Sequence, residues 1–241
     1  MYNLLISFAF GGTVCALLYF GAGIEIGFAV LAMAVVYVAA FFVLSRIFMK
    51  KLTALMQVAE RDMQAGRIDK AIKVLQSGYQ YSKWQLYVKP QLNAQIGMVY
   101  YLKRDFRKAF DYLQNGLNRN WASMGMLGIC YMKRNKPKEM KKTFEKAIRV
   151  TKKEPLLYNL YAFCLEKIGE KDRAVDVMEK GIKKTAEDER LVANLAALKE
   201  GRKMKMLAYG DLWHQFHLEK PGTLIKQQTK AVQGRRKIVK R

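Results

Sequence analysis

The sequence predicts an all-α protein in which a transmembrane helical hairpin precedes an α-solenoid of about four helix pairs plus a capping helix. Three observations support this fold class. Two long apolar stretches lie near the N-terminus, amphipathic helical patterns recur in pairs after residue 51, and only four prolines occur among 241 residues. Because proline breaks helix interiors, its scarcity favours a helical chain.

The two apolar stretches predict two membrane-spanning helices. They cover residues 3–20 and 26–48, and each reaches the roughly 20 residues that cross a bilayer core. The link at 21–25 is short and Gly-rich, and its Glu25 is the only charged side chain among the first 45 residues. Because so short a link forces the spans to run antiparallel, and because backbone groups in lipid must bond internally, we expect a helical hairpin over residues 1–49.

The charges beside the second stretch predict the orientation of the hairpin. Arg46, Lys50 and Lys51 close this stretch, whereas the link has no Lys or Arg. Since positively charged flanks stay on the cytoplasmic side, we expect both termini and the downstream domain to face the cytoplasm, at a bacterial inner membrane. The alternative is a cleaved signal peptide over residues 1–22, but this segment lacks the basic start of such peptides.

Small residues follow one another at four-residue spacing in the first apolar stretch, at Ser7, Gly11 and Cys15. Small side chains let membrane helices approach each other closely. Two interpretations follow: the hairpin packs on itself through this face, or the face receives a transmembrane helix of a partner.

From residue 52 onward, one pattern of small and large residues recurs. A small residue is followed by a large one, then by a turn, an alanine, a second large residue and a second small residue. Ala71, Ala109, Met140 and Ala174 hold the same place in successive copies and lie 38, 31 and 34 residues apart. The four copies read Ala59, Gly66, Ile68, Ala71, Leu75, Gly78; Gly97, Tyr100, Phe106, Ala109, Leu113, Gly116; Gly128, Tyr131, Asn135, Met140, Phe144, Ala147; and Ala162, Leu165, Gly169, Ala174, Met178, Gly181.

With these residues the sequence resembles the tetratricopeptide repeat family, whose 34-residue units each form a helix, a turn and a helix. The resemblance covers residues 52–186 as four units, and residues 189–201 resemble a capping helix. It implies a right-handed stack in which each unit buries its face against its neighbours. The chain then divides into a hairpin at 1–49, a solenoid at 50–201 and a tail at 202–241.

The resemblance also implies a concave groove, lined by the first helix of each unit, that binds a peptide or helix of a protein partner. Its lining in the middle units is apolar and Met-rich, and methionine surfaces adapt to varied partners. Alternatively, some of these side chains pack between adjacent units. The groove positions are Ala94, Met98, Tyr101, Leu102, Ile129, Met132 and Phe163, and the polar positions at its ends are Glu60, Gln64, Lys133, Asn159, Glu166 and Lys167.

The formal net charge of +23 predicts anionic partners. Residues 133–153 hold ten Lys or Arg against two Glu. This basic face is either a solvated convex surface or, as we prefer, a surface for membrane lipid or an acidic protein. Nucleic acid is not expected, because no nucleic-acid-binding fold and no interleaving of aromatic and basic residues is found. The basic face includes Lys133, Arg134, Lys138, Lys141, Lys142, Lys146 and Arg149.

The tail begins with an aromatic segment and ends with a basic one. Trp213 and Phe216 are the predicted anchors of the aromatic segment, which docks on the last repeat, folds into the chain's own groove or enters a partner. His214 and His217 lie nearby, but two histidines are too few ligands for zinc, so no metal is expected. Residues 220–241 carry eight Lys or Arg and no acidic residue.

No catalytic motif, phosphate-binding loop or cofactor site is found, so neither an enzyme nor a small-molecule substrate is predicted. Cys15, Cys130 and Cys164 form no redox or metal motif, and we expect them reduced and buried. The sequence therefore predicts a membrane-anchored scaffold that binds a protein partner during assembly of a membrane complex. The alternatives are a stoichiometric accessory subunit of a membrane transporter or motor, and a membrane tether for nucleic acid or ribosomes.

Overall fold

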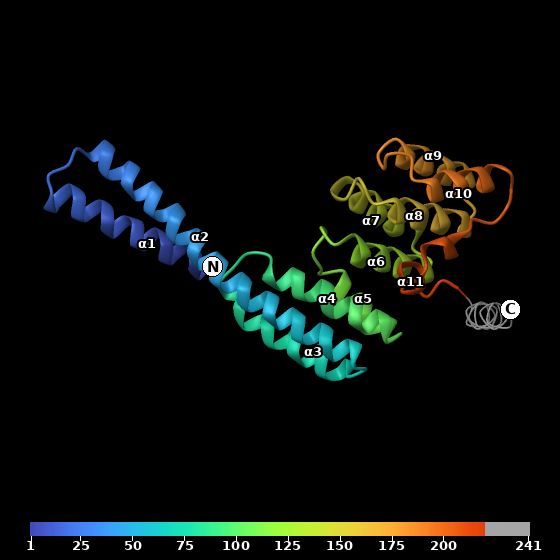
Figure 1. Cartoon of the computed structure of the whole chain (residues 1–241), viewed down its shortest axis with the longest axis horizontal. Coiled ribbons are helices and arrows are strands. Elements are labelled where there is room, and N and C mark those ends of the chain that lie inside the picture. The colour runs from blue at the N-terminus through green and yellow to red at the C-terminus, as the bar shows by residue number, and fades with distance from the viewer. Residues whose placement is uncertain (220–241) are drawn as a thin grey trace, which may run out of the picture. The chain divides into compact units, whose positions relative to one another are not determined.

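The computed structural model describes residues 1–219 and, over these residues, consists of helices joined by short turns (Figure 1). Contacts between residues divide the chain into two compact units. The first is Met1–Ser123 and the second begins at Met124.

An antiparallel helical hairpin begins the first unit. Helix α1 (Tyr2–Ala16) continues through a π-helical turn at Leu17–Gly21, and helix α2 (Ile26–Gln64) returns alongside it. The small residues of α1 face α2: Ser7 and Gly11 are buried. A methyl group on Gly11 would lie only 3.0 Å from a backbone oxygen of α2. The small-residue stripe therefore packs inside the hairpin. This agrees with the first interpretation from the sequence, in which the hairpin packs on itself through this face.

Helix α2 joins the hairpin to the first repeat without a break. It runs for 39 residues, and the sequence has no glycine or proline between Gly27 and Gly66 to interrupt it. Gly66 ends the helix with a positive φ of 74°, which glycine adopts without strain. The boundary that the sequence predicts between residues 49 and 50 falls inside this continuous helix.

The second half of α2 serves as the first helix of the first repeat. Its Leu52 and Ala59 are buried against Ala71 and Leu75 of α3 (Ile68–Ser77). A 3₁₀ segment at Gly78–Lys83 leads to the second pair, α4 (Val88–Leu102) and α5 (Phe106–Leu113).

The second pair shows how the recurrent small and large residues act. Gly97 of α4 lies against Leu113 of α5, where a methyl group would stand 2.8 Å from the leucine side chain. The glycine therefore lets the two helices approach each other closely. Asp105 caps α5 by accepting a hydrogen bond from the backbone N–H of Lys108 at 3.1 Å.

The second unit contains two further helix pairs and a capping helix. The pattern repeats: Gly128 lies directly against the ring of Phe144, and Gly181 lies against Tyr158. A short C-terminal segment then follows the capping helix and returns toward the earlier helices. The elements are α6 (Trp121–Lys133), which starts at the end of the first unit, α7 (Pro137–Val150), α8 (Pro155–Lys167), α9 (Lys171–Ile182), α10 (Glu189–Lys199), a 3₁₀ turn at Met206–Tyr209 and α11 (Asp211–His214).

The order of helices over residues 52–199 is therefore four pairs and a cap. This agrees with the predicted all-α class and with the predicted helical repeats. Residues 220–241, with the predicted basic end of the tail, lie outside the described residues.

Candidate functional site

The first helices of the repeats carry the predicted groove positions, and those of the first unit lie on α4. Ala94 and Tyr101 are buried, Met98 is partly buried and Leu102 is 39% exposed. The ring of Tyr101 meets that of Phe106 edge to face, with 5.1 Å between centroids, so it packs inside its own repeat. Met98 and Leu102 are therefore the predicted groove side chains that α4 leaves accessible.

The groove positions of the second unit lie on α6 and α8. Ile129 is fully buried, whereas Met132 and Phe163 are partly buried. Met132 and Phe163 line one side of a cavity of about 550 Å³, which Lys133 and Leu218 help to close. Ile129, like Ala94 and Tyr101, is therefore buried in the protein interior and is not accessible to a partner.

The chain's own C-terminal segment, residues 202–219, covers the first-helix face of the second unit (Figure 1). A chain of buried hydrogen bonds fixes it there. Asn159 of α8 donates to the hydroxyl of Tyr209 at 2.6 Å and accepts from Asn194 of α10 at 2.9 Å. Asn194 in turn accepts from the backbone N–H of Lys205 at 2.6 Å. These amides satisfy the polar atoms that the segment buries.

Two aromatic anchors complete the docking of this segment. Trp213 is 1% exposed and its ring meets Phe163 edge to face at 5.0 Å. Phe216 is fully buried. A methyl group on Gly125 of α6 would come within 3.3 Å of the Phe216 ring, so this glycine makes room for it. The segment therefore docks on the chain itself, against α6, α8 and α10 of the second unit.

Charge and burial at Tyr209 show how enclosed this contact is. The guanidinium of Arg190 lies over the tyrosine ring, 4.4 Å from its centroid. Burial, followed by the nearby carboxylate of Asp188, raises the pKa of Tyr209. The phenol is therefore neutral over the physiological range and acts as a hydrogen-bonding group.

The basic face lies on α7 and on the end of α6. The buried side of α7 is formed by Met140, Phe144 and Ala147, and its basic residues recur at spacings of three and four on the opposite side. Lys141 is an exception, because it is partly buried and bonds Glu170 at 2.7 Å. The exposed members on α7 are Lys138, Lys142, Lys146 and Arg149, and those at the end of α6 are Lys133 and Arg134.

Two acidic residues beside this face, Glu145 and Glu170, are paired with basic side chains. Glu145 bonds Arg173 of α9 at 2.7 Å, and Glu170 bonds Lys141. Within residues 1–219, no carboxylate lies within 4.0 Å of the ammonium groups of Lys138, Lys142 or Lys146. The exposed side of α7 therefore presents positive charge to solvent.

The cysteines are free thiols. Cys130 and Cys164 are buried in α6 and α8, and Cys15 is partly buried in α1. Burial raises the pKa of Cys130 to about 11 and also raises that of Cys164, so both resist ionisation. Over residues 1–219, no group of three His, Cys, Asp or Glu side chains is placed to hold a metal ion.

Sequence reasoning missed the asparagine network as a unit. Asn159 is one of the predicted groove-end positions, but Asn194 is not among the predicted positions. A signal was present, because both asparagines interrupt an apolar first helix and lie 35 residues apart, close to one repeat length. A polar residue at such a position needs a buried partner, and here the returning segment supplies it.

Comparison with protein families identifies a tetratricopeptide repeat at residues 122–154, which form most of α6 and α7. No protein with a curated description matches the chain. Among solved structures, a crystal structure of MamA is 19% identical with a TM-score of 0.44, over 58% of this chain and 85% of that one. A second MamA structure is 16% identical with a TM-score of 0.48, over 68% and 91% of the two chains. A double mutant, "MamA RS-1 ArsTM", is 12% identical with a TM-score of 0.47, over 69% and 94%.

Proposed function

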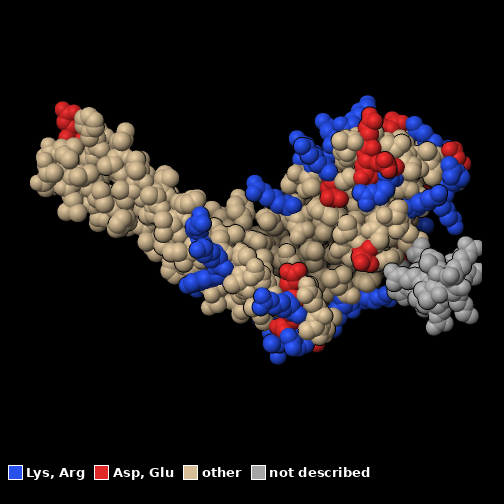
Figure 2. Space-filling view, viewed as in Figure 1, with Lys and Arg blue, Asp and Glu red and all other residues tan. Residues whose placement is uncertain are grey.

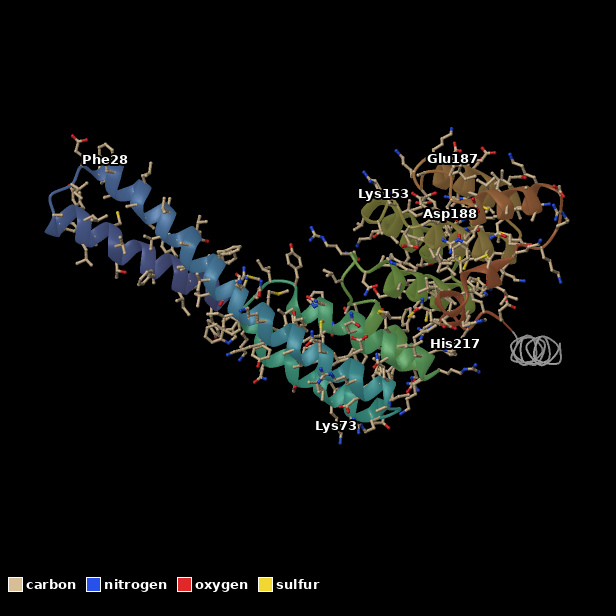
Figure 3. All side chains as sticks on the ribbon, in the orientation of Figure 1. Phe28, Lys73, Lys153, Glu187, Asp188 and His217 are labelled. Carbon is tan, nitrogen blue, oxygen red and sulfur yellow. The ribbon has the colours of Figure 1, made fainter. Side chains whose placement is uncertain are left out.

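We propose that this protein is a non-enzymatic, membrane-anchored adaptor whose repeats bind a protein partner in a membrane complex. The observation that carries the proposal is the exposed apolar surface of the hairpin. Phe20 is 84% exposed, Leu17 70% and Phe28, which points outward near the tip, 67% (Figure 3). Soluble proteins rarely expose so continuous an apolar surface. The visible face of the hairpin has no Lys or Arg along its apolar length (Figure 2).

The length of the two helices supports a membrane-spanning role. By length and composition, Tyr2–Gly21 and the apolar part of α2 are each sufficient to cross a bilayer core. Arg46, Lys50 and Lys51 follow the apolar part of α2, so we place the repeats on the cytoplasmic side of a bacterial inner membrane. Because α2 continues into the first repeat, that repeat is held at the membrane surface without a flexible linker.

The partner-binding surface is proposed to be the first-helix face of the first unit. There Leu102 is exposed and Met98 is partly exposed on α4, whereas residues 202–219 already cover the corresponding face of the second unit. An amphipathic helix presenting an apolar side is the ligand that such a surface suits. The basic face on α7 is proposed to bind an acidic segment of the same partner.

This assignment is tested by purifying the full-length protein from its own membranes in mild detergent, at low and at high salt. The double variant Met98→Glu/Leu102→Glu is expected to lose the partner that wild type retains. The control is Leu212→Glu, which places one glutamate at a leucine that is 53% exposed in the C-terminal segment. Unchanged partner recovery by the double variant, with the protein still folded, contradicts the role of α4.

A stoichiometric accessory subunit of a transporter or motor is the second candidate, and the outer face of the hairpin favours it. No side chain lies within 4 Å of the position that a methyl group on Gly12 would take. On α2, Ala34, Val38 and Phe42 line an open apolar depression. Such a face can pack against a partner's membrane helix. A fixed ratio to one membrane protein that survives high salt distinguishes this role from salt-sensitive, transient binding.

A further inference from the structure

The loop between the first and second repeats is fastened to the base of the hairpin. The backbone N–H of Asn3 donates to the carbonyl oxygen of Trp84 at 3.4 Å. The Trp84 ring also meets Tyr2 edge to face at 5.3 Å and stacks on Phe48 at 4.6 Å. Tyr2 begins α1, and Phe48 ends the apolar part of α2. Trp84 therefore marks the level at which both helices of the hairpin pass from apolar to polar surroundings.

Beyond Trp84, the loop presents apolar side chains outward. Tyr87 is 66% exposed and Leu86 44% exposed, and Met49 of α2 is 38% exposed beside them. These three residues line a cavity of about 410 Å³, together with the polar side chains of Gln85 and Arg119. Tyr87 has a φ of +68°, a left-handed conformation that is unfavourable for a tyrosine. The chain thus tolerates backbone strain at the place where it exposes an aromatic ring.

The charge around this loop has a single sign. Arg46, Lys50 and Lys51 follow the apolar part of α2, and Lys83 and Lys89 flank the loop. The sequence has no Asp or Glu at positions 26–59 or at positions 70–104. Aromatic side chains concentrate at the boundary between lipid tails and headgroups. Basic residues beside that boundary are attracted to anionic headgroups. Aromatic and basic side chains occur together here, at the end of the apolar part of the hairpin.

We propose that the loop Trp84–Tyr87, with Met49, inserts into the headgroup region of an anionic bilayer and makes the first repeat a lipid-binding element. This inference rests on the proposed membrane anchorage and adds a second lipid contact to it, on the repeat itself. Leu86 and Tyr87 would lie in the headgroup region, Lys83 and Lys89 would contact lipid phosphates, and the cavity beside Arg119 would receive a headgroup. A repeat attached at both the hairpin and this loop keeps a fixed orientation at the surface.

The test measures the depth of labelled positions in the full-length protein, reconstituted in vesicles of phosphatidylcholine and phosphatidylglycerol. A fluorescent thiol label is placed singly at Tyr87→Cys, Val35→Cys or Gln64→Cys, in a Cys15→Ala background. Cys130 and Cys164 are buried and remain unlabelled. Gln64 is the matched control on α2, since it lies 16 residues beyond Phe48 and so about 24 Å farther along the helix. Lipids with quenchers near the headgroup or deep in the chains report depth.

We expect strong quenching of the Tyr87 label by the shallow quencher, quenching of the Val35 label by the deep one, and no quenching at Gln64. Deep quenching at Val35 without shallow quenching at Tyr87 overturns the loop inference and leaves the membrane anchor intact. An unquenched Val35 label overturns the anchor itself and the loop inference with it. The inference is also overturned if, in native membranes, another protein and not lipid surrounds the label at position 87.

A charge-reversal pair tests the electrostatic part of the proposal. Lys83→Glu/Lys89→Glu is expected to reduce shallow quenching at Tyr87 in vesicles containing phosphatidylglycerol, and to have a much smaller effect in phosphatidylcholine alone. The control is Lys73→Glu, which reverses an exposed charge on α3 (Figure 3). An equal loss of shallow quenching in both lipid mixtures contradicts a role for headgroup charge. An equal loss of shallow quenching in the Lys73→Glu control contradicts it too.

Discussion

Removal of the Phe216 ring tests whether residues 202–219 are an integral part of the second unit. Phe216 is fully buried and lies against Gly125 of α6. Truncating a buried phenylalanine to alanine costs about 3–5 kcal/mol. Each 1.4 kcal/mol changes an equilibrium tenfold, so Phe216→Ala is expected to raise the opened population of the second unit by about two to three and a half orders of magnitude.

The assay is the alkylation rate of Cys164 in folded, full-length protein carrying Cys15→Ala. Cys164 is fully buried in α8, so its thiol reacts only when the unit opens. The matched control is Leu212→Ala, in the same segment but 53% exposed. It is expected to change stability by no more than about 0.5 kcal/mol. Equal alkylation rates in the two variants would refute the conclusion that the segment stabilises the unit.

Three further predictions concern the interior. Gly128→Ala is expected to destabilise the third helix pair by about 1–3 kcal/mol, because its methyl group would overlap the Phe144 ring; chemical denaturation followed by circular dichroism measures this. Asn159→Ala is expected to cost about 1–3 kcal/mol, since the Tyr209 hydroxyl and the Asn194 amide would lose their buried partner; hydrogen exchange of α10 checks this, and unchanged protection contradicts it. Burial raises the pKa of Cys130 to about 11, so the thiol of the unfolded chain loses its proton at a lower pH than the folded one does. The contribution of this thiol to the free energy of unfolding therefore falls as the pH rises from about 9 to about 11, by up to about 1.4 kcal/mol per pH unit. Denaturation midpoints of wild type and Cys130→Ala should therefore converge as the pH rises over that range, and parallel curves contradict the shift.

The helical repeats were predictable because their contacts are local in sequence. Gly97 and Leu113, or Gly128 and Phe144, are separated by 16 residues, and the small and large side chains meet because one turn joins the two helices. Such a pair recurs with each repeat, so the sequence alone shows the spacing. The buried state of Ala94, Tyr101 and Ile129 was less predictable, because a first helix contacts neighbours on several sides.

The continuity of α2 illustrates a second difference between sequence and structure. The change from apolar to charged residues near Lys50 indicates a change of surroundings, and from it the sequence predicts a domain boundary between residues 49 and 50. The backbone has no reason to break there, since neither glycine nor proline occurs between Gly27 and Gly66. A helix can therefore continue through the point at which its surface changes from apolar to charged.

The docking of the C-terminal segment was left open by the sequence for a physical reason. Asn159 and Tyr209 are 50 residues apart, and Phe216 reaches a glycine on α6 from the far end of the chain. No periodic pattern links such residues. The aromatic composition of the segment indicated that it would bury its rings, but only the fold determines which surface receives them.

The sidedness of single cysteines tests most directly whether the hairpin spans a membrane and holds the repeats on one side. Glu25→Cys and Gln64→Cys are each treated with a membrane-impermeant maleimide in intact cells and in inverted inner-membrane vesicles, in the Cys15→Ala background. A membrane-spanning hairpin predicts labelling of Glu25→Cys only in cells and of Gln64→Cys only in inverted vesicles. Labelling of both positions from the same side would contradict a membrane-spanning hairpin. Release of the protein from the membrane fraction by alkaline carbonate would contradict it as well.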